Sequence, residues 1–142
     1  MPTEDPIISP REILDYLQQQ TPLHIIPDGE NQFFMRNAQS QFPLATVVCN
    51  DAYDTVSQLN HRAGVYRLNV ALSRERFLSL IGAPVKLAPG ETTISGFDYT
   101  QLHTFLPHPH YGMMFWGCIL NPLRTQWPLL QTLLKEAHAA AV

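Results

Sequence analysis

The chain has 142 residues, of which 45% are hydrophobic and 15% are charged, proportions that are ordinary for one globular domain. Its formal net charge of −3 and its scattered arginines disfavour a surface that binds phosphate backbones, so nucleic-acid binding is not expected. The sequence shows no positively charged leader and no apolar run of bilayer length, which predicts a cytoplasmic protein without membrane contact.

The first half of the chain predicts one helix and three strands. Ser9 and Glu12 fit a capping box with proline at the first helical position, which predicts a helix from Pro10 to Gln20. The turn residues Pro27–Glu30 indicate that the strands on either side pair as a hairpin. The expected strands are the apolar Leu23–Ile26, Gln32–Arg36, which should pair back across the turn, and the apolar and β-branched Leu44–Cys49. Asp51–Leu59 carries apolar residues at helical spacing and is expected to be a short helix or turn.

The second half predicts two more strands and three helices. In Val65–Leu72 apolar and polar residues alternate, so one side of this strand should face the core and the other should be polar. Met113–Leu120 is apolar on both sides and predicts the last strand. The expected helices, marked by capping residues or by three-four apolar spacing, are Arg74–Ile81, Tyr99–Leu106 and Thr125–Ala140. Ala83–Gly96 is expected to be a loop.

Together these elements predict a single α+β domain over residues 1–142, with residues 1–8 as a loose lead-in. We expect an antiparallel sheet of about five strands with the N- and C-terminal helices packed on one face. Cys49 and Cys118 lie in apolar runs outside any metal-binding spacing, which predicts reduced thiols in the core. Four aromatic residues are also interpreted as core: Tyr111, Phe115, Trp116 and Trp127.

Three segments of the chain look familiar together. They are Phe42–Val48, Gly64–Val70 and the stretch from Phe97-Asp98-Tyr99 through Pro107-His108-Pro109-x-Tyr111 to Leu120-Asn121-Pro122. With their Arg-Leu-Asn and Pro-His-Pro-x-Tyr motifs, they resemble an uncharacterised bacterial family, a domain of unknown function. More distantly, the order of elements is similar to the MmcQ/YjbR-like group. That resemblance implies an antiparallel sheet backed by helices in a frataxin-like topology, and a binding role that is sometimes suggested to be DNA binding.

The resemblance implies no catalytic role for any residue of this chain. The positions that match the family are Arg67, Asn69, His108, Tyr111, Trp116 and Asn121. Frataxin-like handling of iron would need an acidic ridge, which this sequence lacks. The resemblance therefore bears on the fold more than on the function.

The polar side of the strand Val65–Leu72 is the first candidate site. The residues expected to gather there are Arg67, Asn69, Arg36, Thr46, His108 and Trp116. An arginine beside an amide and an aromatic ring suits a small anionic or aromatic ligand. The alternative is that Arg67 only pairs with a carboxylate on a solvated sheet face. Replacement of Arg67 by alanine is expected to abolish ligand binding without unfolding the domain.

A histidine cluster is the second candidate site. His103, His108 and His110, with Asp98 nearby in sequence, would match a zinc centre with one open position. The alternative is a hydrogen-bonded structural role, because Pro107 separates His103 from the other two histidines. Nucleophilic catalysis by either cysteine is disfavoured, since an apolar strand disfavours the thiolate.

The preferred hypothesis is a non-enzymatic small-ligand-binding domain of the YjbR-like type that needs no cofactor. A metal-assisted enzyme that uses His108 and His110 is the alternative, and DNA binding is a third reading that the acidic charge disfavours. The sequence leaves open both the identity of the ligand and the formation of a homo-oligomer.

Overall fold

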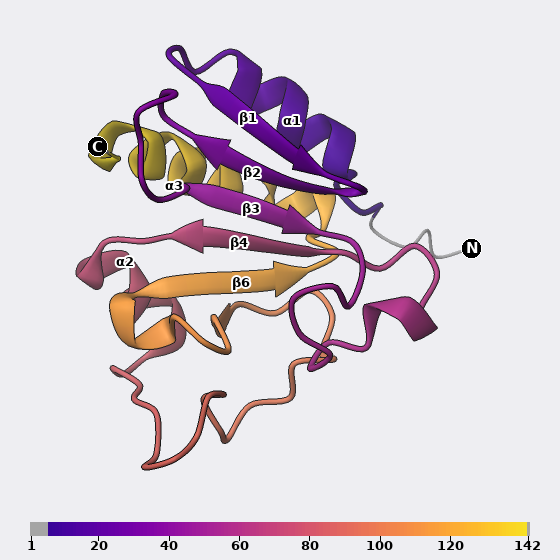
Figure 1. Ribbon diagram of the computed structural model, residues 1–142, viewed down its shortest axis with the longest axis vertical. Helices are drawn as coiled ribbons and strands as arrows, with labels where there is room; N and C mark the ends of the chain where they lie inside the picture. Colours follow the sequence, from indigo (N-terminus) through magenta and orange to yellow (C-terminus); the bar gives the residue numbers. More distant parts are fainter. Residues whose placement is uncertain (1–5, 142) are drawn as a thin grey trace.

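A single antiparallel sheet organises the computed structural model, which describes residues 6–141 (Figure 1). Its six strands lie in the order β1-β2-β3-β4-β6-β5. Their bounds are β1 His24–Asp28, β2 Asn31–Met35, β3 Ala45–Val48, β4 Arg67–Ala71, β5 Leu106–Pro107 and β6 Trp116–Leu120. Every neighbouring pair is antiparallel, so the predicted α+β class is confirmed, with six strands in place of about five.

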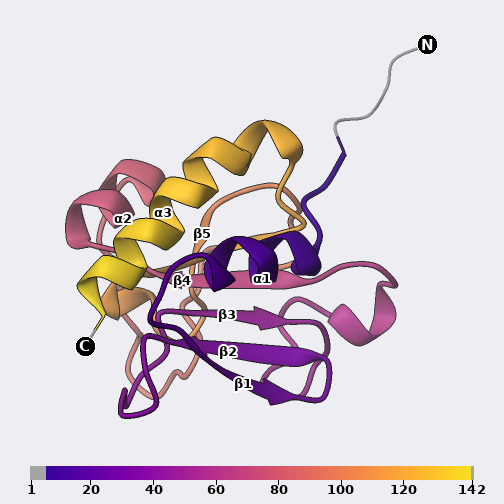
Figure 2. The same ribbon diagram turned by 90° about the horizontal axis from the view of Figure 1, so that it is seen from above.

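The helices cover one face of the sheet. They are α1 Pro10–Gln18, α2 Arg74–Ile81 and α3 Trp127–Ala140. Figure 2 shows α1 and α3 on the same side of the sheet. The core between sheet and helices includes Phe34, Leu68 and Ile119 from the strands and Ile13 and Leu134 from the helices. The predicted packing of the N- and C-terminal helices on one face is therefore confirmed.

Local sequence signals set the start of α1 and the first hairpin. The side chain of Ser9 accepts a hydrogen bond from the N–H of Glu12 at 3.2 Å, and the Glu12 carboxylate accepts one from the N–H of Ser9 at 2.9 Å. The helix ends at Gln18 rather than Gln20, because the next two N–H groups turn back to carbonyls only three residues earlier. Gly29, with a φ of 60°, closes the β1–β2 hairpin.

The helix predicted over residues 99–106 is wrong. Asp98 accepts hydrogen bonds from both the N–H and the hydroxyl of Thr100, at 3.0 and 2.6 Å, and so forms a local turn instead of a helix cap. Tyr99 is buried and donates its hydroxyl to the carbonyl of Ile94 at 2.9 Å. At the end of this segment Leu106 joins the sheet as part of β5, which supplies the sixth strand.

The segment before the last strand also differs from the prediction. The expected strand Met113–Leu120 begins only at Trp116, because Gly112–Met114 forms a 3-10 helix. Both methionines of this turn are therefore exposed instead of buried in the sheet. The final helix starts at Trp127 rather than at Thr125.

The start of the chain is only partly described. Residues 1–5 of the predicted lead-in lie outside the described residues, while Ile7 forms a bridge with Leu123 and Ile8 is buried in the core. The expected short helix or turn after β3 is a series of turns with a 3-10 helix at Leu59–His61. Within residues 6–141, no helix has the length and apolar character needed to cross a membrane.

Candidate functional site

The face of the sheet that the helices leave uncovered opens into a cavity of about 1070 Å³. Side chains of β3, β4 and β6 that alternate with the core residues form its floor and part of its wall. Turns after β3 and after β5 supply further walls, and one end of the cavity reaches the last turns of α3. The lining includes Thr46, Asp54, Arg67, Asn69, His108 and Trp116.

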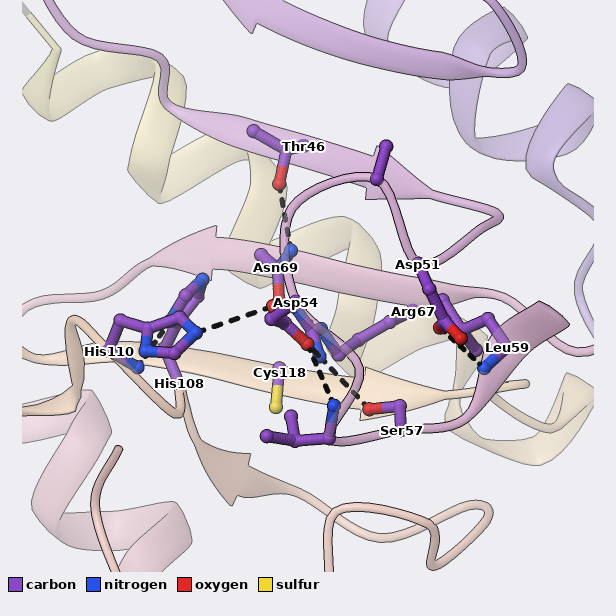
Figure 3. Close-up of polar contacts among 12 residues, drawn as sticks. Thr46, Asp51, Asp54, Ser57, Leu59, Arg67, Asn69, His108, His110 and Cys118 are labelled. Carbon is purple, nitrogen blue, oxygen red and sulfur yellow. Dashed lines mark hydrogen bonds and ion pairs between the residues drawn. The ribbon is translucent and has the colours of Figure 1, made fainter. Parts of the chain in front are cut away.

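A polar network centred on Arg67 forms the floor of the cavity (Figure 3). The two terminal nitrogens of Arg67 donate to the carboxylate of Asp54 at 2.7 and 3.1 Å, and one of them also donates to Oγ of Ser57 at 2.9 Å. Nε of Arg67 donates to Oδ1 of Asn69 at 3.1 Å, and Nδ2 of Asn69 donates to Oγ1 of Thr46 at 2.9 Å. One chain of hydrogen bonds thus links β3, β4 and the turns after β3.

The ion pair of this network is buried. Only 2% of the surface of Arg67 is exposed, and the side chain of Asp54 is largely covered. The alternative derived from the sequence, that Arg67 pairs with a carboxylate, is therefore confirmed for the pairing. The pair lies on a covered face of the sheet, however, and not on a solvated one. Burial tends to raise the pKa of Asp54, but the hydrogen bonds and charge of Arg67 outweigh it and hold that pKa below its usual range. The charge of Asp54 consequently balances that of Arg67.

Asp54 and Ser57 are site residues that the sequence did not indicate. Both lie in turns after β3, where no periodicity places a side chain on either face of the sheet. The available signal was that an arginine on a strand between apolar neighbours requires a carboxylate. That signal could not distinguish Asp54 from Asp51, which lies in the same turns. In the structure Asp51 does not pair with Arg67, and its carboxylate accepts a hydrogen bond from the N–H of Leu59 at 2.9 Å.

His108 stands in the cavity wall in a single tautomer. Its Nδ1 accepts hydrogen bonds from the N–H groups of His110 and Tyr111 at 3.1 and 3.2 Å, so the proton of the neutral ring is on Nε2. Burial, together with the charge of Arg67, lowers the pKa of His108 to about 3. The ring meets Trp116 edge to face, with 6.1 Å between centroids. His108 is therefore a neutral group with one fixed N–H donor.

The three histidines of the second candidate site do not converge. Nδ1 of His110 lies 2.7 Å from the carbonyl of Thr92, to which it can only donate, and its Nε2 lies 3.5 Å from a carboxylate oxygen of Asp54. His103 is outside the cavity wall, with Nδ1 2.6 Å from the carbonyl of Asn121. In the part of the chain that the structure describes, no three His, Cys, Asp or Glu side chains are placed to hold a metal ion.

Arg36, predicted to bind the ligand, and Asn121, which matches the family, are not among the residues that line the cavity. Arg36 donates to the carbonyls of Ala139 and Ala141, at 3.3 and 2.8 Å, where the last turn of α3 leaves carbonyls without helical partners. Asn121 accepts from the N–H of Tyr66 and donates to the carbonyl of Gly64. Of the predicted ligand-binding set, the structure thus gathers four residues around the cavity and places Arg36 apart. The four are Arg67, Asn69, His108 and Trp116.

The rim of the cavity is apolar and exposed. Phe42, Met114 and Tyr111 have the largest exposed fractions of the big hydrophobic side chains among residues 6–141, at 72%, 61% and 53%, and all three border the cavity. The interpretation of Tyr111 as a core residue is therefore wrong, because the 3-10 turn that follows it carries the ring out of the sheet. Exposed apolar groups that collect around one concave surface are typical of a contact site.

Both cysteines are free and unsuited to nucleophilic chemistry. Cys118 is buried against Tyr99 and Leu106, and burial raises the pKa of its thiol to about 12. Burial also raises the pKa of the Cys49 thiol. Each thiol is thus protonated at neutral pH, in agreement with the predicted reduced core thiols.

Gly112 packs the turn after His108 against the long loop, and it offers a test of this wall. A Cβ at this position would lie 2.8 Å from Cδ1 of Ile94, 2.9 Å from Cβ of Pro107 and 3.0 Å from Cγ2 of Val85. We expect Gly112→Ala to lower the free energy of unfolding by about 1–3 kcal/mol, because the proline ring cannot move aside. Urea unfolding measures the change. Met113→Ala alters the exposed neighbour, and an equal loss in both variants would contradict tight packing at position 112.

Comparison with known proteins gives a family but no characterised relative. A family model described as a family of unknown function, DUF6194, matches residues 8–142. No curated protein and no solved structure matches the chain. The matched range contains every residue of the cavity wall and floor. The chain therefore belongs to the DUF6194 family, whose function is unknown.

Proposed function

We propose that this protein is a non-enzymatic binding domain that holds a small planar organic molecule in the cavity on the uncovered face of its sheet. The supporting observation is that one cavity combines a buried hydrogen-bonded floor with an aromatic wall and rim. Ligand sites in proteins are typically apolar concave surfaces with a few fixed polar groups. Here the floor would orient the molecule, and Trp116 and Tyr111 would contact its flat faces.

Of the two ligand types expected from the sequence, the aromatic one is favoured over the anionic one. Arg67 would attract an anion only if its charge were free, but Asp54 binds both of its terminal nitrogens. An anion at the floor would have to displace that carboxylate or lie beside it. The exposed ring of Phe42 and the wall ring of Trp116 offer apolar contacts that need no charge.

Binding is proposed in place of catalysis because the acid–base groups around the cavity are engaged in structural contacts. Asp54 is bound to Arg67, and His108 is neutral and caps the turn that follows it. Similarity to the MmcQ/YjbR-like group and a bacterial, cytoplasmic setting are parts of the same proposal. The helix-backed antiparallel sheet supports the first, and the two free cysteines support a reducing compartment.

The two tryptophans allow a direct test in one sample. Trp116 lines the cavity, whereas Trp127 packs edge to face on Tyr16 at 5.6 Å and is not part of the cavity wall. We expect titration of isotope-labelled protein with 2-acetylnaphthalene to shift the indole N–H signal of Trp116 in NMR spectra and to leave that of Trp127 in place. Equal shifts of the two signals would indicate non-specific association and reject the proposal.

A matched variant blocks the cavity without touching its polar floor. Ala71 is the cross-strand partner of Trp116 and lines the same cavity. A phenyl ring at this position would occupy the space next to the indole. We expect Ala71→Phe to retain the dispersed spectrum of the folded domain and to lose the response of Trp116 to the probe. An unchanged response in this variant would place binding outside the cavity.

A further inference from the structure

We propose that the cavity selects uncharged planar molecules that carry carbonyl-type hydrogen-bond acceptors, because its floor and its His108 wall each offer a ligand a fixed donor without a partner. This rests on the proposed binding function and adds the chemical class of the ligand. The two donors are the hydroxyl of Thr46 on the floor and Nε2–H of His108 on the wall. The directions of both follow from the hydrogen bonds around them.

Arg67 sets the direction of the floor network. A guanidinium nitrogen can only donate, so the atom of the Asn69 amide that faces Nε is the oxygen. The amide nitrogen of Asn69 must then face Thr46 and donate to its Oγ1. The hydroxyl proton of Thr46 consequently points away from Asn69. It has no acceptor among residues 6–141, and Thr46 lines the cavity.

The backbone after His108 sets the second donor. Two N–H groups donate to Nδ1, which leaves the proton on Nε2, and no residue between 6 and 141 accepts a hydrogen bond from that nitrogen. Within the same range, every fully buried side-chain nitrogen or oxygen has a partner. Nε2 of His108 is therefore in contact with the open space of the cavity that the ring lines. A ligand carbonyl placed there would give this N–H a partner.

The acceptors of the same groups are already occupied. Both carboxylate oxygens of Asp54, the hydroxyl oxygen of Ser57 and the amide oxygen of Asn69 accept from Arg67. Nδ1 of His108 accepts from the backbone. A ligand carbonyl oxygen would thus meet donors that lack partners, whereas a ligand N–H would compete for acceptors that already hold hydrogen bonds. Sites of this kind discriminate strongly against molecules of the wrong polarity.

Charge and spacing narrow the class further. The buried charges of Arg67 and Asp54 balance, so the floor has no net charge with which to hold an anion. Thr46 lies on β3 and His108 directly follows β5, which is three strand spacings away, about 14 Å between backbones. A natural ligand with acceptors at two separated positions would reach both donors. An aromatic ketone with one carbonyl would reach one of them.

Two isosteric probes test the choice of ligand polarity. 2-Acetylnaphthalene and 2-isopropenylnaphthalene have nearly the same shape, and a carbonyl oxygen in the first replaces a methylene group in the second. A purely apolar cavity would bind the alkene more tightly, because the alkene leaves water more readily. We expect the protein to bind the ketone about fivefold more tightly, as measured by titration of the Trp116 signal. The charged analogue 2-naphthoate is expected to bind more weakly than the ketone.

The double variant Thr46→Val/His108→Asn removes the hydroxyl of Thr46 and the Nε2–H of His108 from their places in the cavity. Valine matches threonine in volume, and asparagine retains an acceptor for the N–H groups of His110 and Tyr111. We expect the preference for the ketone to disappear in this variant while the alkene still binds. Equal or tighter binding of the alkene to the unmodified protein would overturn the inference but not the proposed function, and so would a preference that persists in the double variant. Failure of both probes to bind the unmodified protein would reject the proposed function and the inference with it.

Discussion

Replacement of Arg67 by methionine is expected to lower the free energy of unfolding by about 3–5 kcal/mol. The substitution leaves the covered carboxylate of Asp54 without a cation and removes the donor that orients Asn69. Urea unfolding followed by circular dichroism measures the loss. Arg11→Met is the matched control, because Arg11 is exposed and its ion pair with Asp15 lies on the surface. The control should change stability by less than about 1 kcal/mol.

A double variant separates the effect of the uncompensated Asp54 charge on stability from the effect of removing the arginine side chain. Because most of it comes from an uncompensated charge, Arg67→Met/Asp54→Leu should be more stable than Arg67→Met alone. A loss in Arg67→Met no larger than in Arg11→Met would contradict a buried ion pair. The sequence led us to expect that Arg67→Ala would abolish binding without unfolding the domain. Because the ion pair is buried, we now expect this substitution to unfold the domain partly or fully. Binding is therefore better tested at Ala71, which lies outside the network.

The second large effect is a loss of stability in mild acid. Between pH 7 and pH 5 the free energy of unfolding should fall by about 2 kcal/mol through His108 alone. Burial and the charge of Arg67 lower the pKa of His108 to about 3 in the folded protein, against an ordinary value of 6.5. In this range the unfolded chain takes up a proton that the folded protein does not. Acid therefore favours unfolding, and the free energy of unfolding increases as the pH is raised from 5 to 7.

Comparison with His108→Asn isolates this contribution. The other histidines are present in both proteins, so their titration cancels in the difference. The groups that influence the ring electrostatically, Arg67, His110 and Asp54, are also unchanged. We expect the variant to lose about 2 kcal/mol less than the unmodified protein between pH 7 and pH 5, measured by urea unfolding at each pH. Parallel pH dependences would contradict a buried, neutral His108.

The parts of the fold that were predictable have strong local signals. The capping box at Ser9 and the glycine of the β1–β2 turn each fix backbone conformation through neighbouring atoms, and both were found where expected. The region around Asp98 was not predictable in this way, since aspartate caps helices and turns equally well. Tertiary contacts decided between the two, because Tyr99 is buried and Leu106 pairs with Cys118 of β6.

The candidate site was predictable where strand alternation controls it. Arg67 and Asn69 share one side of β4, and the structure places both on the cavity floor. The same rule would have excluded Arg36, which follows the core residue Phe34 by two positions and so belongs to the helix-covered side. Asp54 lies beyond the reach of such a rule, because the turns after β3 have no period and only the folded chain brings its carboxylate to the arginine.

The central claim is that the cavity on the uncovered face of the sheet binds a planar molecule. The most direct test is to locate a bound probe by nuclear Overhauser contacts between unlabelled 2-acetylnaphthalene and isotope-labelled protein. We expect contacts to the ring of Trp116 and to the methyl group of Met114, which line the cavity. Contacts confined to exposed apolar side chains elsewhere, such as Ile7 and Phe97, would contradict the claim.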